Sequence, residues 1–294
     1  MRRPYIVAAV VLAVLTVGWR FGLGPRWTMR FPHDGVFSAK YVGTQTNADS
    51  VTGVIPRTDA LSSYDRSLRV IDAAEWPRSV MLIDKYTVRD IQNGTVLYEY
   101  ATKERIDPRT GALADGPNKG EIVLFPRNVQ KRDYTMRSNY LTGVRLKYSG
   151  ESDVGGLNTY KFTYRGPLDL TEAFAGSPEF PGVVVPAGQD VHCADDQFYY
   201  RIWIEPLTGE QAKVEEGCLS GDYIYDTASG KQIAAIDRWN GETSGAGLAA
   251  RVTQVYDARR MYSWAAIYIP GLLIAGCLGC LAAGFLRRNA IALA

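Results

Sequence analysis

The side chains that could perform hydrolytic chemistry are few and unsuitably spaced. A serine hydrolase needs a serine on a tight glycine turn, with a histidine and an acid brought beside it. Residues 241–245 have the glycine spacing of such a turn but carry Thr243 at its centre, and the chain has two histidines, His33 and His192. We therefore predict no catalytic residues and no enzymatic activity, and we rank a hydrolase last among the functions considered.

The residue types that hold metals and cofactors also lack the required spacing. Three acids cluster in one short stretch: Asp190, Asp195 and Asp196. They do not form the D-x-D-x-D-G pattern of a calcium loop, which favours a solvated acidic loop. A zinc site using the nearby Cys193 would need more ligands than this region offers, and His192 is directly adjacent to it in sequence. No glycine loop for phosphate is present, so the sequence predicts neither a metal nor a cofactor.

Aromatic residues are the distinctive feature of the middle of the chain. Of 18 tyrosines, 17 follow Leu23, and many stand in alternating segments such as Tyr160–Arg165. Two interpretations are open. The tyrosines are ordinary residues of a half-buried sheet, or they line an amphipathic cavity that suits a lipid or glycolipid.

Charge divides the chain into three parts. The 294 residues carry 33 basic and 31 acidic side chains, a net charge of +2 that gives no reason to expect nucleic acid as a partner. All acids lie between Asp34 and Asp257, whereas the two ends hold six arginines: Arg2, Arg3, Arg20, Arg26, Arg287 and Arg288. The middle, residues 27–260, keeps 27 basic against 31 acidic residues, so basic apolar ends flank a mildly acidic domain.

The first apolar end predicts a membrane-spanning helix over residues 5–23. Its length is close to the roughly 20 residues that cross the hydrocarbon core. A cleaved signal peptide has a similar basic start and apolar run, but no small-x-small cleavage pair follows, since Trp19, Arg20 and Phe21 come next. An uncleaved anchor is therefore the favoured interpretation.

The second apolar end predicts a span over residues 263–286. It carries no charge from Trp264 to Leu286 and begins among the aromatic residues typical of a membrane interface. Gly276, Cys280 and Gly284 recur every four residues and give one smooth helix face. Such a face suits close packing against the first span or another protein, although small residues are also simply common in such helices.

Basic chain ends and an even number of spans predict the topology. Short basic termini favour the cytoplasm, which makes residues 1–4 and 287–294 cytoplasmic. Residues 24–262 then form one domain outside the cytoplasm, at the plasma membrane. Cys193 and Cys218 are the two cysteines of that domain, and such a pair most often forms a disulfide.

Alternating apolar and polar residues predict that this domain is mainly β. The pattern is clearest at Val144–Tyr148 and Tyr160–Arg165, which we expect to form a hairpin with a long loop. Further strands are expected at residues 67–72, 79–91, 95–106, 121–125, 199–205, 231–238 and 248–256, and one helix at residues 168–175. The expected fold is an antiparallel β-sandwich or barrel-like domain flanked by two transmembrane α-helices.

Four motifs carry a resemblance to a known family. They are Ile106–Gly111, Leu124–Tyr134, Gly155–Phe162 and Trp203–Gly209, in that order between the two spans. With this architecture the chain resembles the actinobacterial PorA-type family of envelope proteins over most of residues 1–286. Arg127 departs from the pattern, where an aromatic or aliphatic residue is expected. The architecture is also similar to class B scavenger receptors, which hold lipids in a β-rich tunnel.

The resemblance implies an envelope domain that binds lipid. It implies cooperation with a large lipid exporter of the mycobacterial-membrane-protein-large type, which moves mycolate-type lipids. The word porin suits the chain poorly, because outer-membrane barrels cross the bilayer with strands. We expect a non-enzymatic protein that binds a lipid or glycolipid and assists its export. The alternative is a scaffold or sensor that docks other envelope proteins without binding lipid.

Overall fold

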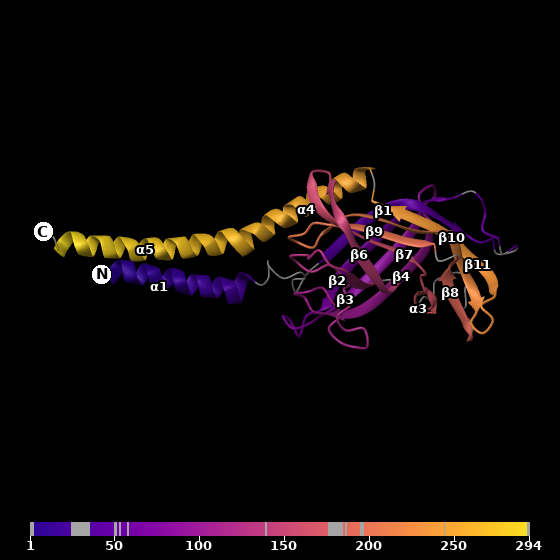
Figure 1. Ribbon diagram of the computed structural model, residues 1–294, viewed down its shortest axis with the longest axis horizontal. Helices are drawn as coiled ribbons and strands as arrows, with labels where there is room; N and C mark the ends of the chain where they lie inside the picture. The colour runs from indigo at the N-terminus through magenta and orange to yellow at the C-terminus, as the bar shows by residue number, and fades with distance from the viewer. Residues whose placement is uncertain are drawn as a thin grey trace.

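The computed structural model describes most of the chain. The described residues are 3–24, 36–49, 52, 54–57, 59–138, 140–175, 185, 187–194, 197–243 and 245–292. His33, Asp195 and Asp196, named above, lie outside them. The described part folds into one β domain and a helical stalk that extends from it (Figure 1).

The β domain is built on a single sheet of eleven antiparallel strands, within the described residues. The main path runs β4-β3-β2-β1-β11-β10-β9-β7-β6-β5, and β8 pairs with β10 beside this path. The strands are β1 (Val36–Asn47), β2 (Leu61–Asp72), β3 (Val80–Asp90), β4 (Val96–Ile106), β5 (Tyr134–Ser138), β6 (Leu141–Val154), β7 (Leu157–Gly166), β8 (Gln189–Cys193), β9 (Phe198–Ile204), β10 (Gln211–Asp226) and β11 (Gln232–Glu242). The prediction of a mainly β, antiparallel domain is confirmed.

The two edges of this curled sheet are joined by the segment between β4 and β5. Ile106 at the end of β4 bridges Leu113, Ala112 bridges Ile122, and Ile122 bridges Met136 of β5. The predicted strand over residues 121–125 is therefore wrong, because the segment makes single bridges in place of a ladder. These bridges close the sheet around one continuous hydrophobic core.

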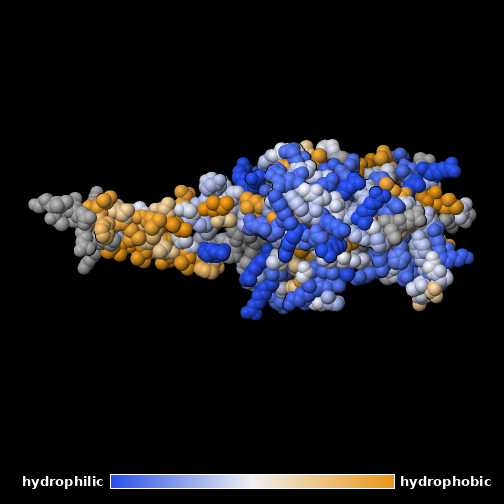
Figure 2. All heavy atoms as spheres, viewed as in Figure 1, coloured by the Kyte–Doolittle hydropathy of each residue, from blue (hydrophilic) through white to orange (hydrophobic). Residues whose placement is uncertain are grey.

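Alternation places the core inside the sheet and polar residues outside it. Along β2, Tyr64 and Leu68 are buried, whereas the intervening Ser67 is exposed. Along β6, Leu146 is buried and Arg145 and Lys147 point outward. On the face shown in Figure 2, the β domain is mainly hydrophilic with small apolar patches, while the stalk is mainly apolar. A barrel that faces lipid would show the reverse pattern.

The β6–β7 hairpin differs from the expectation of a long loop. The strands continue to a two-residue turn, Gly155–Gly156, whose φ angles are +59° and +85°. Two consecutive positive φ values are typical of the tight hairpin turn that glycine favours. The long predicted loop was wrong because Gly150 was counted as a loop residue, although it lies at an irregularity inside β6.

The stalk consists of two helical segments. One comprises α1 (Arg3–Gly18) and the π-helical turn η1 (Trp19–Leu23); the other runs continuously through α4 (Gly245–Ser263), η3 (Trp264–Tyr268) and α5 (Ile269–Ala292). Both contain a stretch long and apolar enough to cross a membrane. The domain's predicted helix is also present in shortened form, as α3 (Thr171–Ala175), with the Asp169 carboxylate accepting a hydrogen bond from the Thr171 amide.

The predicted strand at residues 248–256 is wrong, because this segment belongs to α4. Leu248, Val252 and Val255 follow helical spacing and pack on a second small core around Trp203. Arg251 lies on the same face of the helix, where it is buried and its guanidinium donates to the Gln211 carbonyl at 2.6 Å. The helix therefore starts on the β domain before it enters the stalk.

Near the stalk, the contact that Arg127 makes accounts for its departure from the family pattern. Its guanidinium lies over the ring of Tyr262, 4.4 Å from the centroid. Such a cation–π contact links the loop that carries Arg127 to the last turn of α4. The position thus packs by an Arg–aromatic contact in place of apolar contact.

The two stalk helices lie side by side and bring both chain ends to the same end of the molecule (Figure 1). The Trp19 indole donates to the Ala265 carbonyl at 2.9 Å, so the two π-helical turns are joined. Further along, a side chain on Gly276 would approach Leu12 of α1 to 3.2 Å, and the Cys277 thiol contacts the Ala9 carbonyl at 3.5 Å. Part of the small-residue face of α5 is thus occupied by α1.

Candidate functional site

A pocket of about 40 Å³ lies inside the curled sheet. Its walls are aromatic and aliphatic, and its polar groups come from β1, β10 and β11. The lining residues are Tyr64, Tyr86, Val88, Tyr140, Leu170, Phe174 and Trp239, together with Gln45, Asp222 and Asp237. An apolar wall with a few convergent polar groups is the usual form of a small-molecule site.

Asp222 and Asp237 stand directly opposite each other on β10 and β11. Their exposed fractions are 1% and 2%. Like charges at opposed positions of a sheet are destabilising, and burial raises that cost. A pair that weakens the fold in this way is a candidate for function.

A bulge in β10 gives Asp222 its inward position. The register with β11 shifts between Cys218 and Asp222, and Gly221 adopts a φ of +100°. A side chain at Gly221 would lie 2.9 Å from the Asp237 carbonyl oxygen, so glycine is required by space as well as by conformation. Bulges commonly re-aim side chains beside functional sites.

Donors from outside the pair reach only one oxygen of each carboxyl group. The Trp239 indole donates to Oδ2 of Asp222 at 2.7 Å, and the Gln45 amide donates to Oδ2 of Asp237. Oδ1 of both residues is buried, and among the described residues no donor reaches it other than the opposite carboxyl group, to which each residue is hydrogen-bonded. Burial, followed by the charge of Asp237, raises the pKa of Asp222 well above its ordinary value; burial raises the pKa of Asp237 to about 6.

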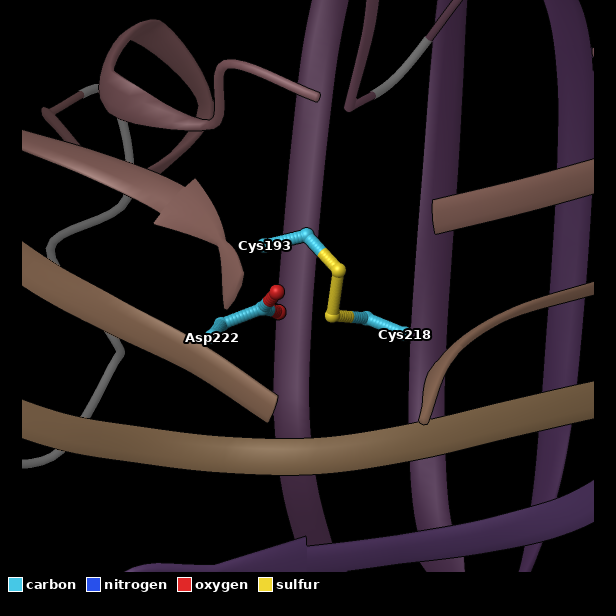
Figure 3. A group of neighbouring side chains, drawn as sticks. All are labelled: Cys193, Cys218 and Asp222. Atoms are coloured by element: carbon cyan, nitrogen blue, oxygen red, sulfur yellow. A yellow bond between two sulfur atoms is a disulfide. The ribbon is translucent and has the colours of Figure 1, made fainter. Parts of the chain in front are cut away.

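The predicted disulfide Cys193–Cys218 is present and lies beside Asp222 (Figure 3). The two sulfurs and an Asp222 oxygen lie within 4.8 Å of one another, a grouping that resembles a metal site. The sulfurs are bonded to each other, however, and metals bind the free thiolate. The bridge instead ties β8 to the bulge in β10 and thereby supports the position of Asp222.

A second buried carboxylate adjoins the pocket. Glu216 accepts hydrogen bonds from the hydroxyls of Tyr86, at 3.0 Å, and of Tyr140. Burial raises the pKa of Glu216 and of both tyrosines, so the tyrosine hydroxyls keep their protons and donate. The nearby Arg66 is engaged by Asp84 at 2.7 Å. The interior is therefore rich in carboxylates relative to cations.

The residues singled out in the sequence fall mostly outside this pocket. Asp190 and His192 are half-exposed on β8, with His192 Nε2 3.8 Å from the Asp190 carboxylate. Thr243 is buried and its hydroxyl accepts a hydrogen bond from the Val214 amide, as a structural residue would. The interpretation that tyrosines line a cavity is consistent with Tyr64, Tyr86 and Tyr140, whereas the carboxylate pair was not foreseen.

Comparison with known proteins gives one informative match. The family model of Porin PorA matches residues 6–286. No curated protein matches the chain. Among solved structures, an acyl-CoA hydrolase from Agrobacterium tumefaciens aligns over 78% of this chain and 84% of its own, with 9% identity and a TM-score of 0.13, which is too low a likeness to bear on fold or activity.

The family match spans both stalk helices and the whole β domain, and it agrees with the motifs identified in the sequence. The chain belongs to the Porin PorA family, as a β domain joined to two helices that are long and apolar enough to cross a membrane.

Proposed function

We propose that this protein is a non-enzymatic component of the cell envelope that binds a lipid or glycolipid and assists its export, next to a large lipid exporter. The observation that carries the proposal is the pocket beneath α3. Phe174 and Leu170 give it an apolar wall, and Asp222 and Asp237 give it a polar one. An amphipathic ligand with a polar head matches this division.

The size of the pocket limits what it holds. Sites that enclose whole drug-sized ligands measure about 300–1,000 Å³, whereas this pocket measures about 40 Å³. The pocket therefore takes the end of a head group, and the acyl chains lie elsewhere.

The proposed topology puts both termini in the cytoplasm and the β domain outside. Three observations support it. The stalk helices lie side by side and bring both chain ends to one end of the molecule (Figure 1). The chain ends are basic, and the β domain holds a disulfide, a bond that persists in oxidising compartments. In sealed, right-side-out vesicles, added protease should digest the β domain and leave tags on both termini intact. Tags that are digested as readily as the domain would contradict this topology.

The scaffold alternative is less well supported. It relies on the small-residue face of α5, but Gly276 already adjoins Leu12 and Cys277 contacts Ala9 within the same chain. That part of the face is unavailable to a partner unless α1 moves away.

Native mass spectrometry of the full chain in detergent tests lipid binding. We expect a fraction of the protein to retain one lipid, and Phe174→Trp, which narrows the pocket, to reduce that fraction several-fold. Phe285→Trp makes the same change on the exposed face of α5 and should leave the fraction unchanged. Lipid-free protein in every preparation, or equal retention by both variants, would contradict the proposal.

A further inference from the structure

We propose that the pocket bounded by Asp222 and Asp237 binds a small organic ammonium group. The polar wall offers two buried oxygens, Oδ1 of each residue, whose hydrogen-bond partner among the described residues is the opposite carboxyl group alone. An alkylammonium carries three N–H donors and a positive charge, and so can serve both oxygens at once.

The charge of the pocket favours a cation. None of the described residues that line it is basic. Arg66, a buried cation that lines an adjoining cavity with Tyr86 and Tyr140, is held by Asp84 through two N–H···O hydrogen bonds, at 3.1 and 2.7 Å. Because burial disfavours two adjacent negative charges, the pair retains a proton between its carboxyl groups, and a bound cation would take the place of that proton.

The remaining walls suit the same ligand. Tyr86 and Tyr140 direct their hydroxyls to Glu216, and Tyr64 donates to the Thr44 carbonyl, so these residues contribute aromatic surface to the pocket. Trp239 likewise gives its indole N–H to Asp222. Aromatic walls around a carboxylate are the usual environment of a recognised ammonium ion.

The volume sets the size of the group. A cavity needs about 10–15 Å³ of space open to the centre of a water-sized sphere to hold one water-sized group. The pocket measures about 40 Å³ in the same way, so it holds about three heavy atoms. Ethylammonium has three. A pyranose ring is far larger, and its hydroxyls would find acceptors at the carboxylates but few donors.

A metal cation is a poorer fit. Calcium requires six to eight oxygen ligands, and magnesium an octahedral set. The pocket supplies the Oδ1 atoms of Asp222 and Asp237 and otherwise mainly aromatic and aliphatic surface. An organic cation uses that surface, whereas a hard metal ion gains nothing from it.

The source of the ammonium group is either a free amine or the head of an amine-bearing lipid, such as an ethanolamine lipid. The lipid source rests on the proposed function, whereas the ammonium site itself does not. The two are separated by comparing a water-soluble amine with a short-chain amine lipid.

The test is saturation-transfer NMR on the full chain in non-ionic detergent and amine-free buffer, with ethylammonium as the probe and ethanol as its neutral counterpart of equal size. Three heavy atoms limit the affinity to a Kd of about 1 mM or weaker. We expect ethylammonium to give saturation transfer that ethanol does not. Asp237→Asn should weaken it at least tenfold, and Asp65→Asn, on the outer face of β2, should leave it within twofold. Equal signals from ethylammonium and ethanol, or an unchanged Kd in folded Asp237→Asn, would overturn the site.

Lysophosphatidylethanolamine then identifies the source. Its displacement of ethylammonium, with no displacement by lysophosphatidylglycerol, would support an amine lipid. Failure of both lipids to displace ethylammonium would overturn the head-group assignment and leave a site for a free amine. Lipid retention in native mass spectrometry without ethylammonium binding would overturn the ammonium site and leave the proposed function intact.

Discussion

At the scale of single residues, the opposed carboxyl groups of Asp222 and Asp237 lower the stability of the folded domain. An ionised carboxylate in a protein interior costs several kcal/mol unless it is paired. Trp239 and Gln45 each satisfy one oxygen, and the second oxygen of each residue meets only the opposite carboxyl group. The fold thus carries a local instability at the pocket, and stability should respond to the charge of this pair.

Asp237→Asn tests that cost directly. Folding raises the pKa of Asp237 from 3.8 to about 6, so the folded state binds the proton more tightly than the unfolded state. Stability is then highest below pH 4 and falls as pH rises through 6, by about 3 kcal/mol at about 1.4 kcal/mol per pKa unit. Asparagine cannot ionise and still accepts the Gln45 hydrogen bond. We expect the variant to unfold at higher temperature than the parent at pH 7 and to lose this advantage near pH 4.

Intrinsic fluorescence during heating, from pH 4 to 8, makes this measurement on the full chain in detergent. Asp65→Asn, a half-exposed acid of β2 paired with Lys40, is the matched control and should follow the parent at every pH. A variant less stable than the parent at pH 7 would show that the carboxylate is a structural requirement and not a cost.

The pair was partly readable from the sequence. Asp237 lies near the end of the strand predicted at residues 231–238, and Trp239 directly follows that strand; a continued extended chain puts the acid and the aromatic residue on one face. Asp222 could not be placed in this way, because the bulge at Gly221 breaks the alternation that would have assigned it a face. The opposition of the two acids depends on pairing between strands and cannot be read from either strand alone.

At the scale of elements, the bulge in β10 and the disulfide act together. Cys218 begins the irregular stretch that ends at Asp222, and Cys193 lies opposite Asp222 on β8. Removal of the bridge should therefore weaken both the fold and the geometry of the pocket.

Replacing both bridged cysteines by serine should lower stability by about 3 kcal/mol, the loop-closure value for a separation of 25 residues. For a domain of this size the unfolding temperature should fall by about 6–12 °C. Reductant should have a similar effect on the parent and none on the variant. An unfolding temperature that does not change in either comparison would show that the bridge contributes nothing to stability.

The packing of α5 on α1 makes a third prediction. Gly276→Leu would put a side chain where Leu12 lies, whereas Gly279→Leu meets nothing within 4 Å. In an Ala9→Cys, Cys280→Ala background, oxidation should cross-link the thiol introduced on α1 to Cys277 across the helix pair. We expect Gly276→Leu to reduce the cross-linked fraction several-fold and Gly279→Leu to leave it unchanged. Equal yields in the two variants would contradict the packing of α1 against this face.

The elements that the sequence misassigned share a physical cause. Leu248, Val252 and Val255 have helical spacing, but the short segment 248–256 also fits a strand. Packing on the second core around Trp203 favours the helix. The β6–β7 strands were shortened for a related reason, since Gly150 signals a turn locally while pairing continues past it. A long apolar run without charges, as in the two stalk helices, needed no such tertiary information.

At the scale of the whole molecule, the pocket is remote from the stalk. α3, which supplies Phe174, lies in the half of the β domain that faces away from α1 and α5 (Figure 1). A lipid head bound there has left the bilayer surface. This position suits transfer to a carrier or exporter outside the membrane better than storage at the membrane itself.

Photo-cross-linking from inside the pocket tests whether the β domain binds lipid in the native membrane. Benzoylphenylalanine would replace Phe174, with Leu219, exposed on β10, as the negative position and Phe285, exposed on α5, as the positive one. After irradiation of intact membranes, mass spectrometry of the peptides measures covalent lipid. We expect lipid adducts at position 174 to be well above those at position 219. Adducts at position 174 no more frequent than at position 219, with position 285 labelled normally, would contradict it.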